Sequence, residues 1–131
     1  LFVGEGAASV LQGQLRGPDA EGLALFELEG GPSLRLLAPL EAGVPASARL
    51  RVLAKDVGIA LHPLSAVSIL NQLPAQLEAL EPAREGRQLL RLRLSGGQPL
   101  LAEITAHSAS QLGLQAGQPL VALIKSVALQ S

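Results

Sequence analysis

Glycine and proline interrupt this chain at intervals of roughly eight to twelve residues, and short stretches rich in Leu and Val lie between them. This regular spacing of turn-forming residues leaves little room for long helices and is typical of an all-β protein with tight turns. In Leu90–Leu94, leucines alternate with Arg91 and Arg93, which predicts a strand with Leu on a core face and Arg in water. Leu is not a favoured strand residue, so the turn rhythm and the alternation decide the assignment. The predicted strands are Ala8–Arg16, Gly22–Glu29, Ser33–Ala38, Ala48–Ala54, Leu73–Leu80, Gln88–Leu94, Leu100–Thr105 and Pro119–Lys125.

An internal repeat divides the chain into two similar halves. Short motifs recur in the same order, and the spacing between matched motifs grows along the chain, as it does when insertions fall in loops. The matched pairs are Ser9–Leu11 with Ser68–Leu70, Leu28–Gly31 with Leu94–Gly97, and Ala54–Val57 with Ile124–Val127. We therefore predict two β units, residues 1–62 and 65–131, joined near His62–Leu64. Each unit is small for an independent core, so it should pack on the other unit or on a partner chain.

One short helix is predicted in the second unit. Ser108–Gln111 fits a capping box, in which the Ser108 hydroxyl accepts from the backbone N–H of Gln111 and the Gln side chain reaches back. Gly113 or Gly117 is expected to end this helix.

Composition excludes several classes of function. A 131-residue chain with 48% apolar residues can bury a core, but its net charge of −1 provides no positive field for a nucleic-acid backbone. Phe2 and Phe26 are the only aromatic residues, too few to stack bases. The absence of Cys excludes disulfides and thiolate metal sites, and agrees with a reducing compartment. His62 and His107 lie in different units and do not predict a metal site.

The sequence also argues against membrane insertion and catalysis. The uncharged run Val57–Leu77 is interrupted by prolines and polar residues, so no transmembrane helix or signal peptide is predicted. The chain starts at Leu1 without a Met, and we expect it to be a piece of a longer protein. The phosphate-loop motif G-x-x-x-x-G-K-[ST] is missing from the sequence, and Gly4–Gly6 has no matching strand and helix context. Asp19 and Asp56 fall in no nucleophile motif, so we do not expect an enzyme.

A set of hydrogen-bond donors with few carboxylates among them remains. A tetrahedral oxyanion is best held by hydroxyls, amide N–H groups and one or two cations, because all its oxygens are acceptors. Glu103 would oppose such a ligand, because it should share a strand face with one of these donors. Each donor also has a structural interpretation, as a helix cap, an exposed strand lysine or a turn residue. The donors are Ser68, Asn71, Thr105, Ser108, Lys125 and Ser126.

Taken together, four segments of the second unit resemble the molybdate-binding Mop or TOBE domain. They are Ser68–Asn71, Leu94–Gly97, Ile104–Leu114 and Ala122–Val127. The first unit, with Ala54–Leu61, resembles the preceding unit in the C-terminal regulatory region of molybdate ABC transporter ATP-binding subunits. The resemblance implies an all-β fold of two tandem OB-like five-stranded barrels, with one short helix in the second unit. It also implies a homodimer with oxyanion sites at contacts between domains.

The resemblance assigns the site residue by residue. Ser68, Asn71 and the backbone around Leu70 would come from one side of the site. The other side would consist of Thr105, Ser108, Lys125 and Ser126. Leu70 stands where the family often has Arg, so one cation is missing. In the first unit Ser9 and Lys55 match, but Ala38–Glu41 replaces the Thr-x-x-Ser segment, and we expect no complete site there.

The implied function is a regulatory domain of a molybdate or tungstate importer. Its ligand would be molybdate or tungstate, without a cofactor, and occupancy would exert feedback control on the attached ATPase. The implied partners are a second copy, an upstream ATPase domain and the membrane subunits, which places the chain in the cytoplasm at the inner face of the membrane. One alternative is a structural dimerisation module without a ligand. Another is a TOBE domain for sulfate, whereas a sugar ligand would need acceptors as well as donors.

Overall fold

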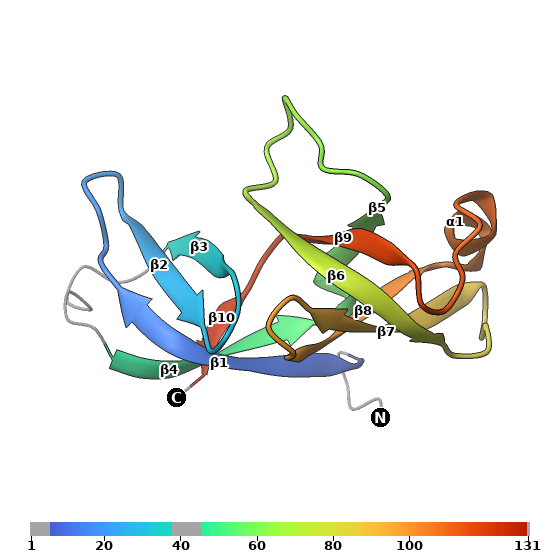
Figure 1. Ribbon diagram of the computed structural model, residues 1–131, viewed down its shortest axis with the longest axis horizontal. Coiled ribbons are helices and arrows are strands. Elements are labelled where there is room, and N and C mark those ends of the chain that lie inside the picture. Colours follow the sequence, from blue (N-terminus) through green and yellow to red (C-terminus); the bar gives the residue numbers. More distant parts are fainter. Residues whose placement is uncertain (1–5, 38–45, 131) are drawn as a thin grey trace.

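The computed structural model describes residues 6–37 and 46–130, and these ranges form two five-stranded sheets with one short α-helix (Figure 1). The predicted all-β class is confirmed. The first sheet has the strand order β10-β4-β1-β2-β3 and the second β5-β9-β6-β7-β8. The elements are β1 (Ala8–Arg16), β2 (Leu23–Leu28), β3 (Ser33–Leu37), β4 (Ala46–Leu53), the 3-10 turn η1 (Ala54–Asp56), β5 (Val57–Ala60), β6 (Asn71–Leu80), β7 (Arg87–Leu94), β8 (Pro99–Thr105), α1 (Ala106–Gln111), β9 (Pro119–Ile124) and β10 (Ala128–Gln130).

Alternating leucines form the core. In β7 the buried side chains are Leu90, Leu92 and Leu94, while Arg91 and Arg93 point to solvent, as the period of two predicted. The same alternation buries Leu34 and Leu36 of β3 and exposes Arg35. One continuous hydrophobic cluster contains side chains from both sheets, so the two sheets share a core.

The two halves of the chain exchange a strand. Strand β5 follows the first sheet in the sequence but pairs with β9 in the second, and β10 at the end of the chain pairs with β4 in the first. Neither strand was among those predicted. The boundary near His62–Leu64 stays a prediction, and each sheet incorporates one strand from the other side of it.

The repeated Gly-Gly turns explain how the halves fit together. The turn after β2 and the turn after β7 lie against each other, and a Cβ on Gly96 would lie 2.1 Å from the carbonyl oxygen of Gly30. A Cβ on Gly31 would lie 2.5 Å from the carbonyl oxygen of Ser95. The equivalent glycines Gly30 and Gly96 therefore approach each other closely, and only glycine at position 96 permits this approach.

The helix begins three residues earlier than predicted. Thr105 is its N-cap, and the Thr105 hydroxyl accepts from the backbone N–H of Ser108 at 3.0 Å. The prediction of Ser108 as the cap was wrong, because β8 runs up to Thr105 and the helix starts at the next residue. Gly113, with φ of 63°, follows the C-cap Leu112 as expected. Within the described ranges, no helix is both long and apolar enough to cross a membrane.

Candidate functional site

A pocket of about 400 Å³ lies where the edge strand β3 meets the loop before β6 and the end of β9. We call it the Lys125 pocket. Of the predicted site residues, it brings together Ser68, Leu70, Asn71, Lys125 and Ser126. Its other lining residues are Leu23, Arg35, Leu36, Leu37, Ile69, Ile124 and Val127.

Strand pairing explains why these segments meet. Asn71, the first residue of β6, pairs with Ile124, the last residue of β9. The chain before Asn71 and the chain after Ile124 therefore leave the second sheet at the same end. The backbone N–H of Lys125 also donates to the carbonyl of Asp56 at 2.9 Å, which fixes the first residue of the outgoing segment.

Two neighbouring amide side chains, Asn71 and Gln72, form hydrogen bonds with backbone groups around the pocket. Asn71 accepts from the backbone N–H of Arg35 through Oδ1 and donates to its carbonyl through Nδ2, both at 2.8 Å. Gln72 makes the same pair of contacts with the backbone of Leu64, at 2.8 and 3.0 Å. Asn71 thereby fastens the edge of β3 to the start of β6, and one of its amide hydrogens stays available to a ligand.

The charged groups lining the Lys125 pocket are both cations. Arg35 and Lys125 contribute positive charge, and no Asp or Glu from the described part of the chain lines the pocket. Leu37 and Leu70 at its rim are 78% and 62% exposed. Arg35 was not among the predicted site residues, because it lies on the other sheet and far away in the chain.

Thr105 and Ser108 lie elsewhere within this chain. Thr105 is at the far end of β8, paired with Arg87, and its hydroxyl is hydrogen-bonded to the Ser108 hydroxyl at 2.9 Å. Neither residue lines the Lys125 pocket. Within one chain, the structure therefore does not bring all the predicted donors together.

A second pocket, of about 680 Å³, surrounds Lys55, the repeat counterpart of Lys125. We call it the Lys55 pocket. Leu89 and Glu103 line it at the positions that Leu23 and Leu37 hold in the other half, counted from the Gly-Gly turns. Its remaining lining residues are Gly6, Glu81, Pro82, Arg84, Glu85, Arg87 and Gln88. Three carboxylates balance its three cations, and Arg87 pairs with Glu103 at 3.4 Å.

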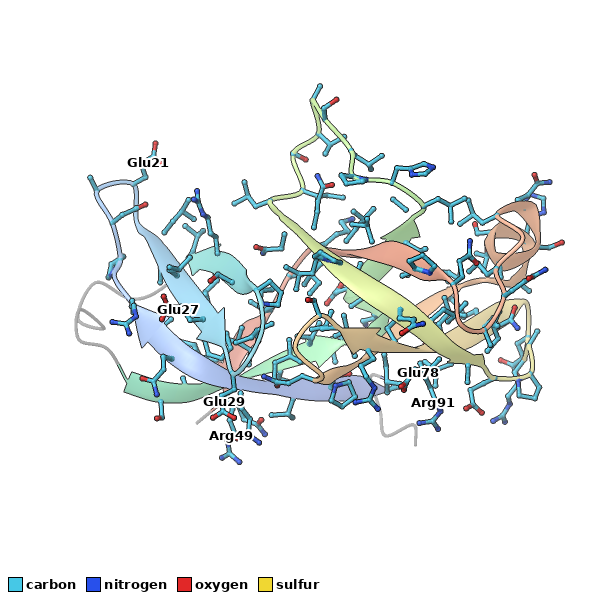
Figure 2. All side chains as sticks on the ribbon, viewed as in Figure 1. Glu21, Glu27, Glu29, Arg49, Glu78 and Arg91 are labelled. Atoms are coloured by element: carbon cyan, nitrogen blue, oxygen red, sulfur yellow. The ribbon has the colours of Figure 1, made fainter. Side chains whose placement is uncertain are left out.

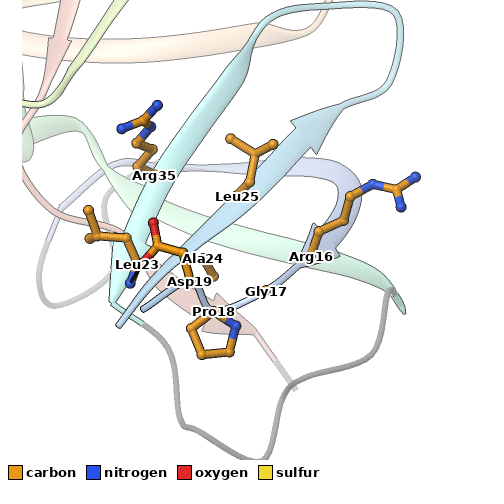
Figure 3. A pocket seen from close by; sticks show the side chains of 8 residues that line it. All are labelled: Arg16, Gly17, Pro18, Asp19, Leu23, Ala24, Leu25 and Arg35. Atoms are coloured by element: carbon orange, nitrogen blue, oxygen red, sulfur yellow. Dashed lines mark hydrogen bonds between the residues drawn. The ribbon is translucent and has the colours of Figure 1, made fainter. Parts of the chain in front are cut away.

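A smaller pocket, of about 280 Å³, adjoins the β1–β2 hairpin and shares Leu23 and Arg35 with the Lys125 pocket (Figure 3). Asp19 lies on the same side of the hairpin as Arg35 in this view. Its carboxylate accepts from the backbone N–H groups of Glu21 and Leu23 at 2.9 and 3.0 Å. This carboxylate therefore has a structural role in the turn.

Ion pairs join glutamates to several other arginines, namely Arg16, Arg87, Arg91 and Arg93. Arg16 contacts Glu27 and Arg91 contacts Glu81, each at 2.6 Å. Glu27 and Arg91, one member of each pair, are labelled in Figure 2. The hydrogen bond with Glu78 and the charge of Glu78 raise the pKa of Arg93.

Comparison with known proteins shows what the chain is similar to. The TOBE domain model matches residues 67–130, which is just under half of the chain. The whole chain is similar to molybdenum import ATP-binding proteins named ModC. It is 40% identical to that of Pseudomonas aeruginosa over 98% of this chain and 36% of that protein, and 42% identical to that of Aromatoleum aromaticum over 83% and 29%. The chain thus spans about a third of the length of these curated relatives.

A solved structure supports the fold. The cytoplasmic molybdate-binding protein ModG, crystallised with molybdate bound, superposes with a TM-score of 0.76 and 24% identity, over 92% of this chain and 93% of that one. The predicted OB-like architecture is confirmed. The segment matched by the TOBE domain model contains β6 to β10 and every predicted site residue, whereas Arg35 lies outside it.

Proposed function

We propose that this chain is an oxyanion-binding regulatory domain of a molybdate importer, with molybdate or tungstate held in the Lys125 pocket. The observation that carries the proposal is the donor set of this pocket. It combines the cations Arg35 and Lys125 with the hydroxyl-bearing residues Ser68 and Ser126, without a lining carboxylate in the described part of the chain. The names of the ModC relatives and the ligand of ModG support molybdate as the anion.

The chemistry of the pocket matches a tetrahedral dianion better than a neutral ligand. A lysine ammonium and an arginine guanidinium donate hydrogen bonds but accept none, and both carry a full positive charge. Hydroxyls and the remaining amide hydrogen of Asn71 can add neutral donors around the same oxygens. A sugar would leave the cations without an acceptor of matching charge.

A second copy of the chain would complete the site at a dimer interface. It would bring Thr105 and Ser108, which one chain does not place in the pocket. The exposed side chains of Leu37 and Leu70 beside the pocket give such a contact apolar surface to bury. Ser108 would donate through its hydroxyl, since the Thr105 hydroxyl already donates its hydrogen to the Ser108 hydroxyl oxygen.

Regulation would follow from the linkage between ligand and dimer arrangement. A bound anion stabilises whichever arrangement it binds better, by the difference in its affinity for the two. In the parent protein, this difference would restrain the attached ATPases and so provide feedback control of transport. The parent would act on the cytoplasmic side of the membrane together with its membrane subunits.

Calorimetric titration with sodium molybdate, tungstate and sulfate tests the proposal. We expect molybdate to bind, and Lys125→Ala to weaken binding by about tenfold or more through loss of a charge-assisted contact. Lys55→Ala, the matched control in the other half, should change the affinity by less than about twofold. Absence of heat with all three anions would overturn the proposal. A dimer that then forms without ligand would favour the structural module. Heat with sulfate alone is a separate outcome, which would overturn molybdate as the ligand and favour the sulfate domain.

A further inference from the structure

We infer that Arg35 is the second cation of the oxyanion site, so that the two halves of one chain build the site together. This inference rests on the proposed function and adds a specificity-determining residue from outside the segment matched by the TOBE domain model. The residue belongs to β3 in the first sheet, whereas the remaining polar lining residues belong to the second half of the chain.

The backbone of Arg35 is fixed relative to the rest of the pocket. Asn71 holds both the N–H and the carbonyl of Arg35 at 2.8 Å, and Asn71 pairs with Ile124, the neighbour of Lys125. Arg35 is therefore connected to Lys125 through two residues, Asn71 and Ile124. The side chain leaves β3 on the exposed face, because Leu34 and Leu36 on either side of it are buried.

The guanidinium of Arg35 is available to a ligand. Among the described residues, no carboxylate forms an ion pair with it, in contrast to Arg16, Arg87, Arg91 and Arg93. Asp19, which lines the adjoining pocket with Arg35, accepts two backbone N–H groups through Oδ1 and forms no ion pair with Arg35 among the described residues. An incoming anion would therefore not have to displace an existing ion pair.

Charge balance gives Arg35 its role. A dianion beside Lys125 alone would keep half its charge uncompensated, and Leu70 adds no charge to the pocket. The planar guanidinium can contact two oxygens at once, which a point-like ammonium cannot. A tetrahedral dianion between Arg35 and Lys125 would thus join the first sheet to the second.

The test is titration of sodium molybdate into the wild-type chain and into Arg35→Ala, Arg35→Lys and Arg49→Ala. Arg49 is an exposed strand arginine outside the pocket, so its variant removes the same charge without touching the site. We expect Arg35→Ala to weaken binding by about tenfold or more, Arg35→Lys to weaken it less, and Arg49→Ala to change it by less than about twofold. Equal affinities for Arg35→Ala and Arg49→Ala, with binding by the wild type intact, would overturn the inference and leave the proposed function standing. A wild-type chain that binds no molybdate would instead overturn the proposed function.

A rescue variant separates the charge of Arg35 from a purely structural role. Leu70 is 62% exposed and lines the same pocket, so Leu70→Arg can return a cation to it. In the Arg35→Ala background, Leu70→Arg should restore at least part of the lost affinity. If Arg35→Ala weakens binding and this second change restores none of it, then Arg35 positions the strand rather than the ligand, and the inference is wrong.

Discussion

The two halves of this chain place a lysine at the same position of the repeat, but the pockets around Lys125 and Lys55 differ in charge. The Lys125 pocket is lined by two cations and no carboxylate from the described part of the chain. The Lys55 pocket combines Lys55 and two arginines with Glu81, Glu85 and Glu103. The two halves therefore share the position of the lysine, while their other lining residues give the two pockets different charges.

The position of Leu37 and Glu103 illustrates this difference most clearly. Both residues stand at the same distance after a Gly-Gly turn, on the edge strands β3 and β8. Leu37 is uncharged and exposed, whereas Glu103 is largely covered and pairs with Arg87. A carboxylate at this position neutralises a neighbouring cation that an anionic ligand would otherwise use.

The largest expected effect is on the free energy of unfolding, and it concerns the contact between the Gly-Gly turns of the two halves. Gly96→Ala should lower the free energy of unfolding by about 3 kcal/mol or more, because its Cβ would overlap the backbone of Gly30. Gly97→Ala is the matched control, since Gly97 also has a positive φ but its Cβ would meet nothing within 4 Å. This variant should cost only about 1 kcal/mol. Urea denaturation measures both, and equal losses would contradict the close approach of the turns.

The next largest effect is expected on molybdate affinity, when the Lys125 pocket is given a carboxylate that the Lys55 pocket contains. Leu37→Glu copies Glu103 into the Lys125 pocket and should weaken molybdate binding by about tenfold to a hundredfold, since the carboxylate competes for the cations. Leu37→Gln introduces a side chain with the shape of glutamate but without its charge. The affinity of this variant for molybdate should lie within about threefold of that of the wild type. Calorimetry compares the two variants. Indistinguishable affinities would show that lining charge does not distinguish the pockets.

The smallest expected effect is a difference in the free energy of unfolding. It concerns two side chains, one in each half, that form hydrogen bonds with the edge strand of the other half. Asn71 makes two hydrogen bonds to the backbone of Arg35, whereas Ser9 accepts one, from the N–H of Leu101 at 2.8 Å. Asn71→Ala should lower the free energy of unfolding by about 1 to 2 kcal/mol and Ser9→Ala by about 1 kcal/mol. Thermal and urea unfolding without ligand measure these losses. A greater loss in Ser9→Ala would reverse the ranking of the two contacts.

Local sequence patterns predicted most of the strands. The bounds predicted for β1 agree with the structure, because alternating apolar residues and the following Gly17 and Pro18 define its end. Strands β5 and β10 have only four and three residues, and β10 is exposed throughout, so neither carries an alternation that could be recognised. The helix was placed too late because two overlapping segments, at Thr105 and at Ser108, both fit a cap.

The sequence predicted a donor set for the candidate site but not how its residues assemble. Hydrogen-bond donors with few carboxylates among them favoured an oxyanion ligand, which stays a prediction, and the structure brings Ser68, Lys125 and Ser126 into one pocket. Arg35 could not be assigned in this way, because its place in the pocket depends on how the edge of one sheet meets the other. The comparison of repeats offered one signal, since Arg35 has the uncharged Leu101 as its counterpart.

Diffraction from a crystal of this chain soaked in sodium molybdate tests the central claim most directly, because molybdenum scatters strongly enough to be located by itself. The account predicts a molybdenum peak between Arg35 and Lys125, in contact with the Ser68 and Ser126 segments, and none beside Lys55. A peak in the Lys55 pocket, or an empty Lys125 pocket at saturating molybdate, would contradict it.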